Sequence, residues 1–237
     1  MNPIHEAERA VLVALARRFP DSFVWTGGSL LQLHEQSPRA SLDVDLIPSG
    51  APVDASEFAE AVAEALGALN AILGSQFESS IAEEGRGLLR LRIHEAETDA
   101  AFTVDVTRIA GAGGRTRSVL VNSLLGTAAV NAPGVSTLLR QKARALLFRR
   151  FAKAGDIFDI WFLLQRGAKL EDNDRLALQD ELLAAGIDEE TVEERFAVLS
   201  RLTWVPALTK SGVGGLNRET AVQILVSVRA FVETLLP

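Results

Sequence analysis

Two aspartates one residue apart, Asp43 and Asp45, are the residues whose types and spacing point most directly to chemistry. They lie in the segment 42–47, which is otherwise apolar and is bounded by Pro, Ser and Gly, as β-strands are. Side chains of a strand alternate between its two faces, so both aspartates are expected on one face, with Val44 and Leu42 toward the core. Two adjacent carboxylates repel unless a cation lies between them, and hard oxygen ligands favour Mg²⁺.

A third carboxylate comes from the segment "FTVDVTRI", where Asp105 interrupts an apolar strand pattern. Three carboxylates with Mg²⁺ are typical of phosphoryl-transfer sites, in which metal ions neutralise the phosphates and align the nucleophile with the leaving group. An ion pair between Asp105 and Arg90 or Arg92 of a neighbouring strand explains the single residue equally well. Asp-x-Asp also occurs by chance on solvated strand faces.

A glycine-rich turn precedes the aspartates. Gly27, Gly28 and Ser29 follow the short strand expected at 23–26, and a helix is expected from Leu30 to His34. Backbone N–H groups at a helix start suit an anion such as phosphate, and the serine adds a hydroxyl. Taken alone, Gly-Gly-Ser is a common structural turn. The ordered combination is more informative: strand, Gly-Ser, thirteen residues, Asp-x-Asp, and a later strand with one more aspartate.

The elements around these residues predict an α/β (α+β) fold, in which a mixed-sheet core is followed by an α-helical bundle. An N-terminal helix with Asn2 as cap, a helix over 55–73 capped by Asp54, and strands 77–82, 88–93, 101–109 and 118–121 build the core, with loop 111–115 before the last strand. We place the domains at 1–128 and 129–237, and expect the second to complete an active-site cleft.

Helices dominate beyond Pro133. Ser136 is expected to cap a helix that runs to about residue 154, where Gly155 interrupts it, and a second helix covers 156–165. Further helices are expected at 174–185, 189–201 and 218–236, with caps at Asp188 and Asn217 and a mobile loop at 203–216.

Composition narrows the function classes. A net charge of −7, from 24 basic and 31 acidic residues, argues against non-specific coating of nucleic acid, although a local basic patch is compatible with it. The absence of cysteine excludes disulfides, thiolate metal sites and cysteine nucleophiles. The three histidines lack zinc-ligand spacing. With neither a signal-peptide pattern nor a run of about 18 apolar residues, the sequence predicts a cytoplasmic protein without a membrane partner.

Two blocks carry a resemblance to a known family. "TGGSLLQLHEQSPRASLDVDLI" resembles the Gly-Gly-Ser and Arg-x-Ser-x-Asp-x-Asp signature of the AbiEii/AbiGii toxins, which belong to the DNA polymerase beta-type nucleotidyltransferase superfamily and to type IV toxin–antitoxin systems. "STLLRQKARALLFRRFAKAGDIFDIWFLL" is similar to the helical block of that family. The resemblance covers roughly residues 24–165.

The resemblance implies roles for individual residues. Gly27, Gly28, Ser29, Arg39 and Ser41 would bind the nucleotide, together with Lys142. Asp43, Asp45 and Asp105 would bind Mg²⁺, in a site that favours two metal ions, and Asp105 alternatively accepts the proton of the attacking hydroxyl. Asp156 matches an aspartate of a later catalytic motif. One departure is Gly155, where the family usually has arginine.

Lys142 is also notable without the family. Its neighbours on a helical wheel are Leu138, Ala145 and Leu146, so it emerges from an apolar face, where a lysine either extends to solvent or meets an anion. From Arg140 to Lys153 there are six basic residues and no acidic one, a candidate contact for a triphosphate or RNA. A solvated basic flank paired with acidic helices is the alternative.

Asp156 and Asp159 lie in a segment that is apolar almost all round, so at least one of them is expected to be buried with a partner. We assign Asp156 a functional role and Asp159 a structural one, bonded to a helix end or an arginine. Trp25, beside the glycine turn, is expected in the core.

The sequence therefore predicts an Mg²⁺-dependent nucleotidyltransferase that moves a nucleoside monophosphate from an NTP to an acceptor hydroxyl. The resemblance implies RNA, in particular a tRNA 3′ end, as acceptor, growth arrest as the consequence and an antitoxin as partner. Protein hydroxyls are a second acceptor class. The alternatives are a non-catalytic nucleotide-binding or regulatory module on the same fold, and a small-molecule nucleotidyltransferase of the antibiotic-modifying type.

Overall fold

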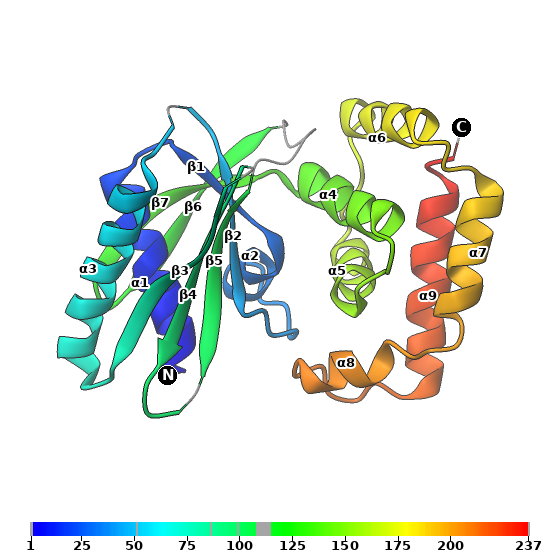
Figure 1. Ribbon diagram of the computed structural model, residues 1–237. Helices are drawn as coiled ribbons and strands as arrows, with labels where there is room; N and C mark the ends of the chain where they lie inside the picture. Colours follow the sequence, from blue (N-terminus) through cyan, green and yellow to red (C-terminus); the bar gives the residue numbers. More distant parts are fainter. Residues whose placement is uncertain (1, 51, 86, 99, 108–114, 237) are drawn as a thin grey trace. The chain divides into compact units, whose positions relative to one another are not determined.

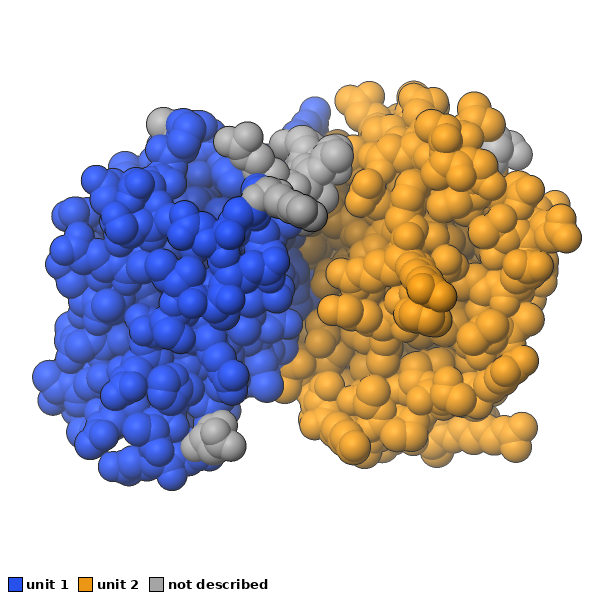
Figure 2. All heavy atoms as spheres, in the orientation of Figure 1, with its two compact units in different colours: residues 1–36, 41–133 blue, residues 37–40, 134–237 orange. Residues whose placement is uncertain are grey.

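The computed structural model describes residues 2–50, 52–85, 87–98, 100–107 and 115–236, whose helices and strands are drawn in Figure 1. The chain forms two compact units, coloured in Figure 2. The first comprises 1–36 and 41–133, and the second comprises 37–40 and 134–237. The chain therefore passes between the units at three points, and the last of these lies later than the boundary placed after residue 128. The expected loop 111–115 lies, apart from Arg115, outside the described residues.

A mixed seven-stranded sheet forms the centre of the first unit, within the part of the chain that the structure describes. In spatial order its strands are β3 (Phe77–Gly85), β4 (Leu88–Glu95), β5 (Ala101–Thr107), β2 (Asp43–Pro48), β1 (Phe23–Thr26), β7 (Gly126–Pro133) and β6 (Thr116–Ser123). The pairs β2–β5 and β1–β7 are parallel, and the other neighbours are antiparallel. The prediction of a mixed-sheet core followed by helices is confirmed.

Two helices, α1 (Pro3–Arg18) and α3 (Ala55–Leu73), pack against each other and against the sheet. Figure 1 shows them side by side on one sheet face. Their buried apolar residues meet the buried strand positions, among them Val44 and Val104, so this face is the hydrophobic core. Asn2 and Asp54 cap the two helices as predicted, accepting hydrogen bonds from N–H groups of the first turn.

Polar contacts fix the position of α1 on the sheet. The buried Glu6 accepts the N–H of Leu124 at 2.5 Å, and Arg17 donates to the carbonyl oxygens of Leu125 and Thr127 at 2.9 and 3.3 Å. These carbonyls and the N–H belong to the turn between β6 and β7 and to the start of β7. The helix is thus tied at both ends to the last hairpin of the sheet.

Three local predictions for the first unit need correction. Leu42 is 54% exposed, because β2 begins only at Asp43 and Leu42 lies before the strand. The helix after β1, α2 (Gly27–Leu33), begins at Gly27 instead of Leu30. The sequence analysis placed no strand at β7, whose alanines, glycine and asparagine are weak strand formers; pairing with β1 and β6 stabilises it.

Six helices build the described part of the second unit: α4 (Val135–Phe148), α5 (Ala154–Gln165), α6 (Asp172–Ala184), α7 (Glu189–Leu199), α8 (Val205–Lys210) and α9 (Arg218–Glu233). The nearly all-apolar α5 contacts α4, α8 and α9 and buries Ile157, Phe158 and Ile160. Asp188 and Asn217 cap α7 and α9 as predicted.

Other expectations for this unit are wrong. α4 ends at Phe148, six residues before the expected end near 154, and begins with Gly134 as its cap. Ser136 instead donates its hydroxyl to Asp174 at 2.6 Å and accepts the N–H of Glu171 at 2.8 Å. The segment predicted as the mobile loop 203–216 contains helix α8. Among the described helices, none is long and apolar enough to span a membrane.

Candidate active site

Three carboxylates share one face of the sheet. Asp43 and Asp45 alternate with the buried Val44 on β2, and Asp45 lies directly opposite Asp105 in the parallel register of β2 with β5. Residues opposite each other on paired strands project to the same side of a sheet. The face that carries Asp43, Asp45 and Asp105, called here the carboxylate face, is therefore opposite to the apolar face covered by α1 and α3.

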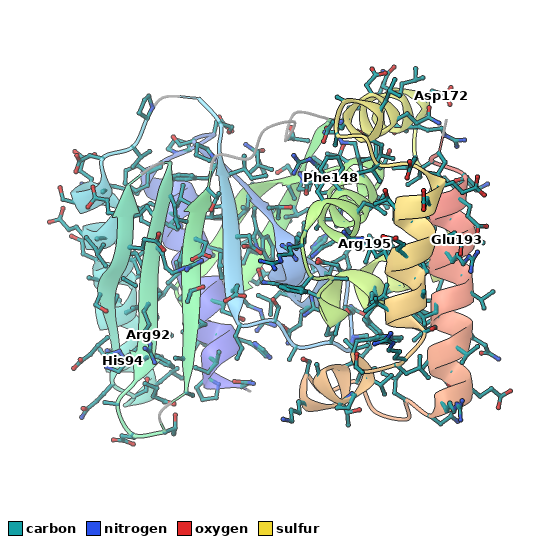
Figure 3. All side chains as sticks on the ribbon, turned by 45° about the vertical axis from the view of Figure 1, so that its right-hand side comes forward. Arg92, His94, Phe148, Asp172, Glu193 and Arg195 are labelled. Carbon is teal, nitrogen blue, oxygen red and sulfur yellow. The ribbon has the colours of Figure 1, made fainter. Side chains whose placement is uncertain are left out.

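Asp43 is the most accessible of the three. Its side chain is exposed and accepts a hydrogen bond from the hydroxyl of Thr103 at 2.9 Å. Thr103 is its cross-strand neighbour on β5, and Arg92 of β4 is the next residue in the same row. Arg92, exposed on β4, is labelled in Figure 3. Thr103 thus orients the carboxylate and leaves the second oxygen for a ligand.

Asp105 is held by Arg90. The guanidinium donates from Nε to Oδ1 at 2.8 Å and from Nη2 to Oδ2 at 2.6 Å, a two-point contact between neighbouring strands. This bonding raises the pKa of Arg90 above its ordinary value, with a smaller contribution from Glu83, whose carboxylate lies at 3.6 Å. The sequence analysis had offered this ion pair as the alternative to a metal role for Asp105, and the structure contains it.

The glycine turn fits closely against Asp45. A Cβ atom placed on Gly27 would lie 1.9 Å from Asp45 Oδ2, and the φ angle of Gly27 is +81°. Only glycine satisfies both conditions, because it has no Cβ and adopts positive φ without strain. The conformation of Gly27 therefore lets the backbone of the turn approach the carboxylate face.

Ser29 points away from solvent. It is fully buried, and its hydroxyl accepts the indole N–H of Trp25 at 2.9 Å. Trp25 is buried as well, which confirms its predicted place in the core. Gly28 is buried within α2. The Ser29 side chain is thus part of the support of the turn, and the contribution of Ser29 to an anion would come from its backbone.

The carboxylate face provides the donor chemistry of a magnesium site: carboxylate oxygens on adjacent strands, one of them exposed. Within the described ranges, no group of three or more Asp, Glu, His or Cys side chains already has the geometry to hold a metal ion. The contact with Arg90 accounts for this at Asp105, because both oxygens of that carboxylate face the guanidinium. Arg90 is 40% exposed, so it has room to move aside.

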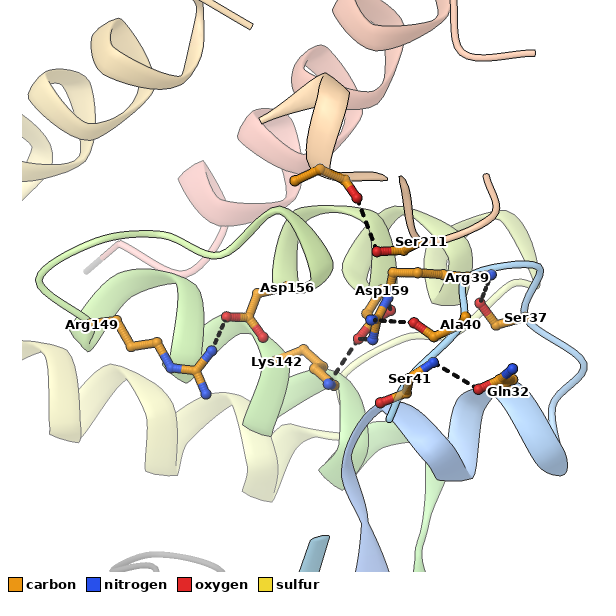
Figure 4. Close-up of polar contacts among 11 residues, drawn as sticks. Gln32, Ser37, Arg39, Ala40, Ser41, Lys142, Arg149, Asp156, Asp159 and Ser211 are labelled. Carbon is orange, nitrogen blue, oxygen red and sulfur yellow. Dashed lines mark hydrogen bonds and ion pairs between the residues drawn. The ribbon is translucent and has the colours of Figure 1, made fainter. Parts of the chain in front are cut away.

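In the second unit, Lys142 meets an anion. Its ammonium lies 2.8 Å from Asp159 Oδ2, and both side chains are nearly inaccessible to solvent (Figure 4). Arg39 contacts the same carboxylate through Nε and Nη2, each at 2.8 Å. The arginine partner predicted for Asp159 is confirmed. Two residues from the nucleotide-binding set, Arg39 and Lys142, are brought together by a carboxylate to which we assigned no catalytic role.

Gly155, the departure from the family pattern, is explained by Arg39. A Cβ atom on Gly155 would lie 3.1 Å from Arg39 Cζ and 3.2 Å from Nη1. The guanidinium of Arg39 would thus be in tight contact with the first atom of any side chain at position 155. In this chain an arginine from the segment 37–40 therefore fills the place next to Asp156.

Asp156 is buried and forms an ion pair with Arg149, which follows α4 (Figure 4). The segment 149–153 between α4 and α5 contains Arg149, Arg150, Phe151 and Lys153. Phe151 is 75% exposed, and the guanidinium carbon of Arg150 lies 5.2 Å from the centre of its ring. This segment therefore presents an exposed aromatic ring among basic residues.

Ser41, the last residue of the predicted nucleotide-binding set, is buried just before β2. Its N–H donates to Gln32 Oε1 of α2 at 2.7 Å (Figure 4). Sequence reasoning missed Gln32 and Thr103, both of which orient the segment that carries the aspartates. The alternation of the β5 pattern places Thr103 on the face of Asp105, but no sequence signal pairs it with Asp43.

Known proteins resemble this chain at the level of fold and family. No curated protein matches the chain in sequence. Among solved structures, JHP933 from Helicobacter pylori has 14% identity and a TM-score of 0.58, with 96% of this chain and 89% of that chain covered. MenT4, a nucleotidyltransferase toxin from Mycobacterium tuberculosis, has 18% identity and a TM-score of 0.50, with 91% and 69% covered. At these identities the likeness concerns the fold.

The family comparison is more specific. Residues 10–211 match the family described as nucleotidyl transferase AbiEii toxin, type IV toxin–antitoxin system. The match includes both blocks on which the resemblance was based, the carboxylate face, and the residues around Asp159. The chain thus belongs to the AbiEii family of type IV toxin–antitoxin systems and is a nucleotidyltransferase.

Proposed function

We propose that the protein transfers a nucleoside monophosphate from an NTP to a hydroxyl of RNA, with Mg²⁺ held by Asp43, Asp45 and Asp105, and that the 3′ end of tRNA is the acceptor. Family membership implies an NTP substrate and a cognate antitoxin. The choice of Mg²⁺, a two-metal arrangement and the RNA acceptor go beyond it. The observation that carries the proposal is the register of β2 with β5, which sets Asp45 beside Asp105 on the face of Asp43.

Each carboxylate has a separate task in this proposal. Asp43 and Asp45 would hold the cation from one strand, and Thr103 keeps Asp43 in orientation. Asp105 would add a third carboxylate if Arg90 moved aside. A bound Mg²⁺ would neutralise charge on the triphosphate. We assign Asp105 to the metal in preference to proton transfer, because both of its oxygens already face a cation in the structure.

In the first unit, the backbone N–H groups at Gly27, Gly28 and Ser29 would contact phosphate, and in the second unit Lys142 is the candidate for a phosphate contact. Arg39 engages both oxygens of Asp159, so that carboxylate keeps a partner when Lys142 turns toward a phosphate. This arrangement gives Arg39 and Asp159 a supporting role and Lys142 the contact with substrate. Asp156, with Arg149 as its partner, would support the basic segment that follows α4.

RNA is favoured as acceptor by the segment 149–153. Its basic residues suit a phosphate backbone, and the exposed ring of Phe151 offers a surface on which a base can stack. Small cationic acceptors, such as the antibiotics modified by related transferases, need an acidic pocket instead. The segment 149–153 is basic and does not suit such an acceptor.

The test is transfer of label from each of four α-³²P NTPs, with Mg²⁺, into total RNA, total protein and a small-molecule pool. The wild type and Asp45→Asn are compared, and Asp54→Asn serves as matched control because asparagine also caps a helix well. We expect label in tRNA with the wild type and the control, and at least a hundredfold less with Asp45→Asn.

Label in small molecules or protein, with RNA unlabelled, would overturn the RNA acceptor and retain the enzyme. Absence of transfer from every NTP, together with NTP binding by calorimetry, would favour the regulatory module. Circular dichroism of the variants checks that the loss of transfer is not a loss of fold.

A further inference from the structure

A chain of side-chain hydrogen bonds connects helix α1 to the start of β2, all within the first unit. Gln32 Oε1 accepts the N–H of Ser41 at 2.7 Å, Gln32 Nε2 lies 2.9 Å from His5 Nε2, and His5 Nδ1 lies 3.0 Å from Glu8 Oε2. Glu8 is fully buried and Ser41 nearly so. Ser41 is two residues before Asp43. The chain of contacts therefore ends at the segment that leads into the carboxylate face.

The role of each atom follows from the backbone. The N–H of Ser41 is a donor, so the oxygen of the Gln32 amide must face it and the NH₂ must face His5. The NH₂ group is a donor as well, so His5 Nε2 must accept and carry no proton. The proton of the neutral imidazole is then on Nδ1, where it is donated to the carboxylate of Glu8. A single arrangement of donors and acceptors satisfies all three contacts.

The surroundings of Glu8 suit this arrangement. Glu8 is on α1, and its Oε2 accepts from His5. Among the described residues its Oε1 is buried and has no hydrogen-bond partner. Burial raises the pKa of Glu8, the bond from His5 acts in the opposite direction, and the charge of Asp43 raises it further. His5 is the polar group that Glu8 contacts, which fixes the imidazole ring on α1.

We propose that Gln32 is a positioning residue for nucleotidyl transfer, and that His5 and Glu8 keep its amide in the orientation that holds the N–H of Ser41. A buried N–H needs a partner, and here that partner determines where the strand with Asp43 and Asp45 begins. The inference rests on the proposed function of the carboxylate face. None of the three residues is assigned a contact with substrate.

The first test reads the histidine tautomer directly and does not depend on activity. The chain has three histidines, so long-range ¹H–¹⁵N spectra of the labelled protein resolve them individually. His5 is expected in the Nδ1–H form, with Nε2 as an acceptor; Gln32→Met keeps the Glu8 contact and hence the tautomer, but should shift the Nε2 resonance because its donor is lost. A wild-type His5 in the Nε2–H form would overturn the proposed orientation of Gln32.

The second test measures transfer as a function of Mg²⁺. Gln32→Met removes both amide contacts with little change of volume, and Gln223→Met on the exposed surface of α9 is the matched control. We expect Gln32→Met to raise the Mg²⁺ concentration for half-maximal rate about tenfold and to leave the KM for NTP within about twofold. His5→Leu, which keeps Gln32 but frees its amide to rotate, should show a smaller shift in the same direction.

A third variant distinguishes positioning from mere packing. Gln32→Glu still accepts the N–H of Ser41 but also faces His5 with an acceptor, so it needs His5 protonated. Its rate relative to wild type should rise as the pH falls, and the other charged groups that act on this site, Glu8 and Arg9 of α1 and Asp43 of β2, are the same in both proteins.

The outcomes separate this inference from the proposed function. An active wild type with Gln32→Met unchanged in its Mg²⁺ dependence overturns the positioning role alone. A wild type without transfer from any NTP overturns the proposed function and the positioning role with it. Should Gln32→Met fail to fold, His5→Leu and Gln32→Glu carry the same comparison.

Discussion

At the scale of single residues, the metal role proposed for Asp105 and the ion pair observed with Arg90 involve the same carboxylate. The strand register places it in the row of Asp45, as a metal ligand requires, and the same register places Arg90 on its other side, as an ion pair requires. The proposed metal contact and the ion pair would use the same two oxygens of Asp105. A metal ion would therefore have to displace Arg90, which weakens its binding at Asp105.

Removing Arg90 should therefore strengthen the binding of Mg²⁺. Arg90→Ala is expected to reduce the Mg²⁺ concentration for half-maximal transfer by about threefold, the size of a partly exposed ion pair. Arg92→Ala removes the same charge from the same strand and face without a bond to Asp105, and should leave the Mg²⁺ dependence unchanged. Equal effects of the two variants would show that Mg²⁺ binding responds to the positive charge of the strand and not to the specific contact between Arg90 and Asp105.

Phe151 allows a test of the acceptor. Stacking of a base on an aromatic ring contributes about 1–3 kcal/mol, so Phe151→Ala should raise the KM for RNA at least about fivefold and leave the KM for NTP unchanged. Leu183→Ala on α6 removes another strongly exposed apolar side chain and is the control. An unchanged KM for RNA would contradict a stacking role of the segment 149–153.

At the scale of elements, α4 and α5 are joined by shared polar contacts in addition to apolar packing. Lys142 of α4 and Asp159 of α5 are bonded, and Arg39 reaches the same carboxylate by passing over Gly155. The absence of a side chain at position 155 is thus a packing requirement of this chain. A relative with arginine there would need a different course for the residue at position 39.

Gly155→Ala tests that requirement. The added Cβ would lie 3.1 Å from Arg39 Cζ, closer than an ordinary contact, so the guanidinium must shift slightly and its two bonds to Asp159 are disturbed. We expect a loss of about 1–3 kcal/mol in the free energy of unfolding, measured with urea, although alanine is the better helix former. The double variant Gly155→Ala/Arg39→Ala should lose little beyond Arg39→Ala, because the clash is then absent. Additive losses would contradict this explanation.

Elements with strong local sequence signals were predicted more accurately than elements without them. Helices with a capping residue and a clear apolar stripe, such as α3, α7 and α9, were placed nearly at their observed bounds. β7 was missed because "GTAAVNAP" has few β-branched residues and depends on its neighbours for pairing. α8 was missed because it is short and contains a proline. The secondary structure of such segments depends on their contacts with the rest of the fold.

At the scale of the whole molecule, charge that is buried in the first unit links stability to pH. The pKa of Glu8 is raised in the folded protein, mainly by burial, so the folded state binds its proton more tightly than the unfolded state. The contribution of the protonated form to stability is complete below the ordinary pKa of glutamate and is lost as the pH rises through the raised value.

Glu8→Gln should remove that dependence. The amide is neutral at all pH values and still accepts from His5, so the variant should gain stability relative to wild type as the pH rises above the ordinary glutamate range. Thermal unfolding at a series of pH values checks this, and Glu57→Gln on the exposed surface of α3 serves as control. A difference that does not change with pH would contradict the raised pKa.

The candidate site was predictable from the sequence where a residue stands out in its own segment. Asp43, Asp45 and the glycine turn form one segment, Asp105 interrupts an apolar strand pattern, and the helical wheel of α4 singled out Lys142. Glu8 lies on the apolar stripe of α1 with Val11 and Leu12, which is a signal of a buried partner, but nothing local names His5 and Gln32 as its continuation. Contacts such as Arg39 with Asp159 span too much of the chain for pattern reasoning.

Because the second unit includes residues 37–40 as well as 134–237, it cannot be exchanged between related proteins as one continuous segment. Residues 37–40 precede β2 in sequence, yet Arg39 bonds Asp159 and the N–H of Ala40 donates to the carbonyl oxygen of Ser211. A chimera joined only near residue 133 would therefore inherit this tetrapeptide from the wrong parent. Exchange of the helical half between homologues should succeed when 37–40 is transplanted with it, and natural crossovers that separate the two should be selected against.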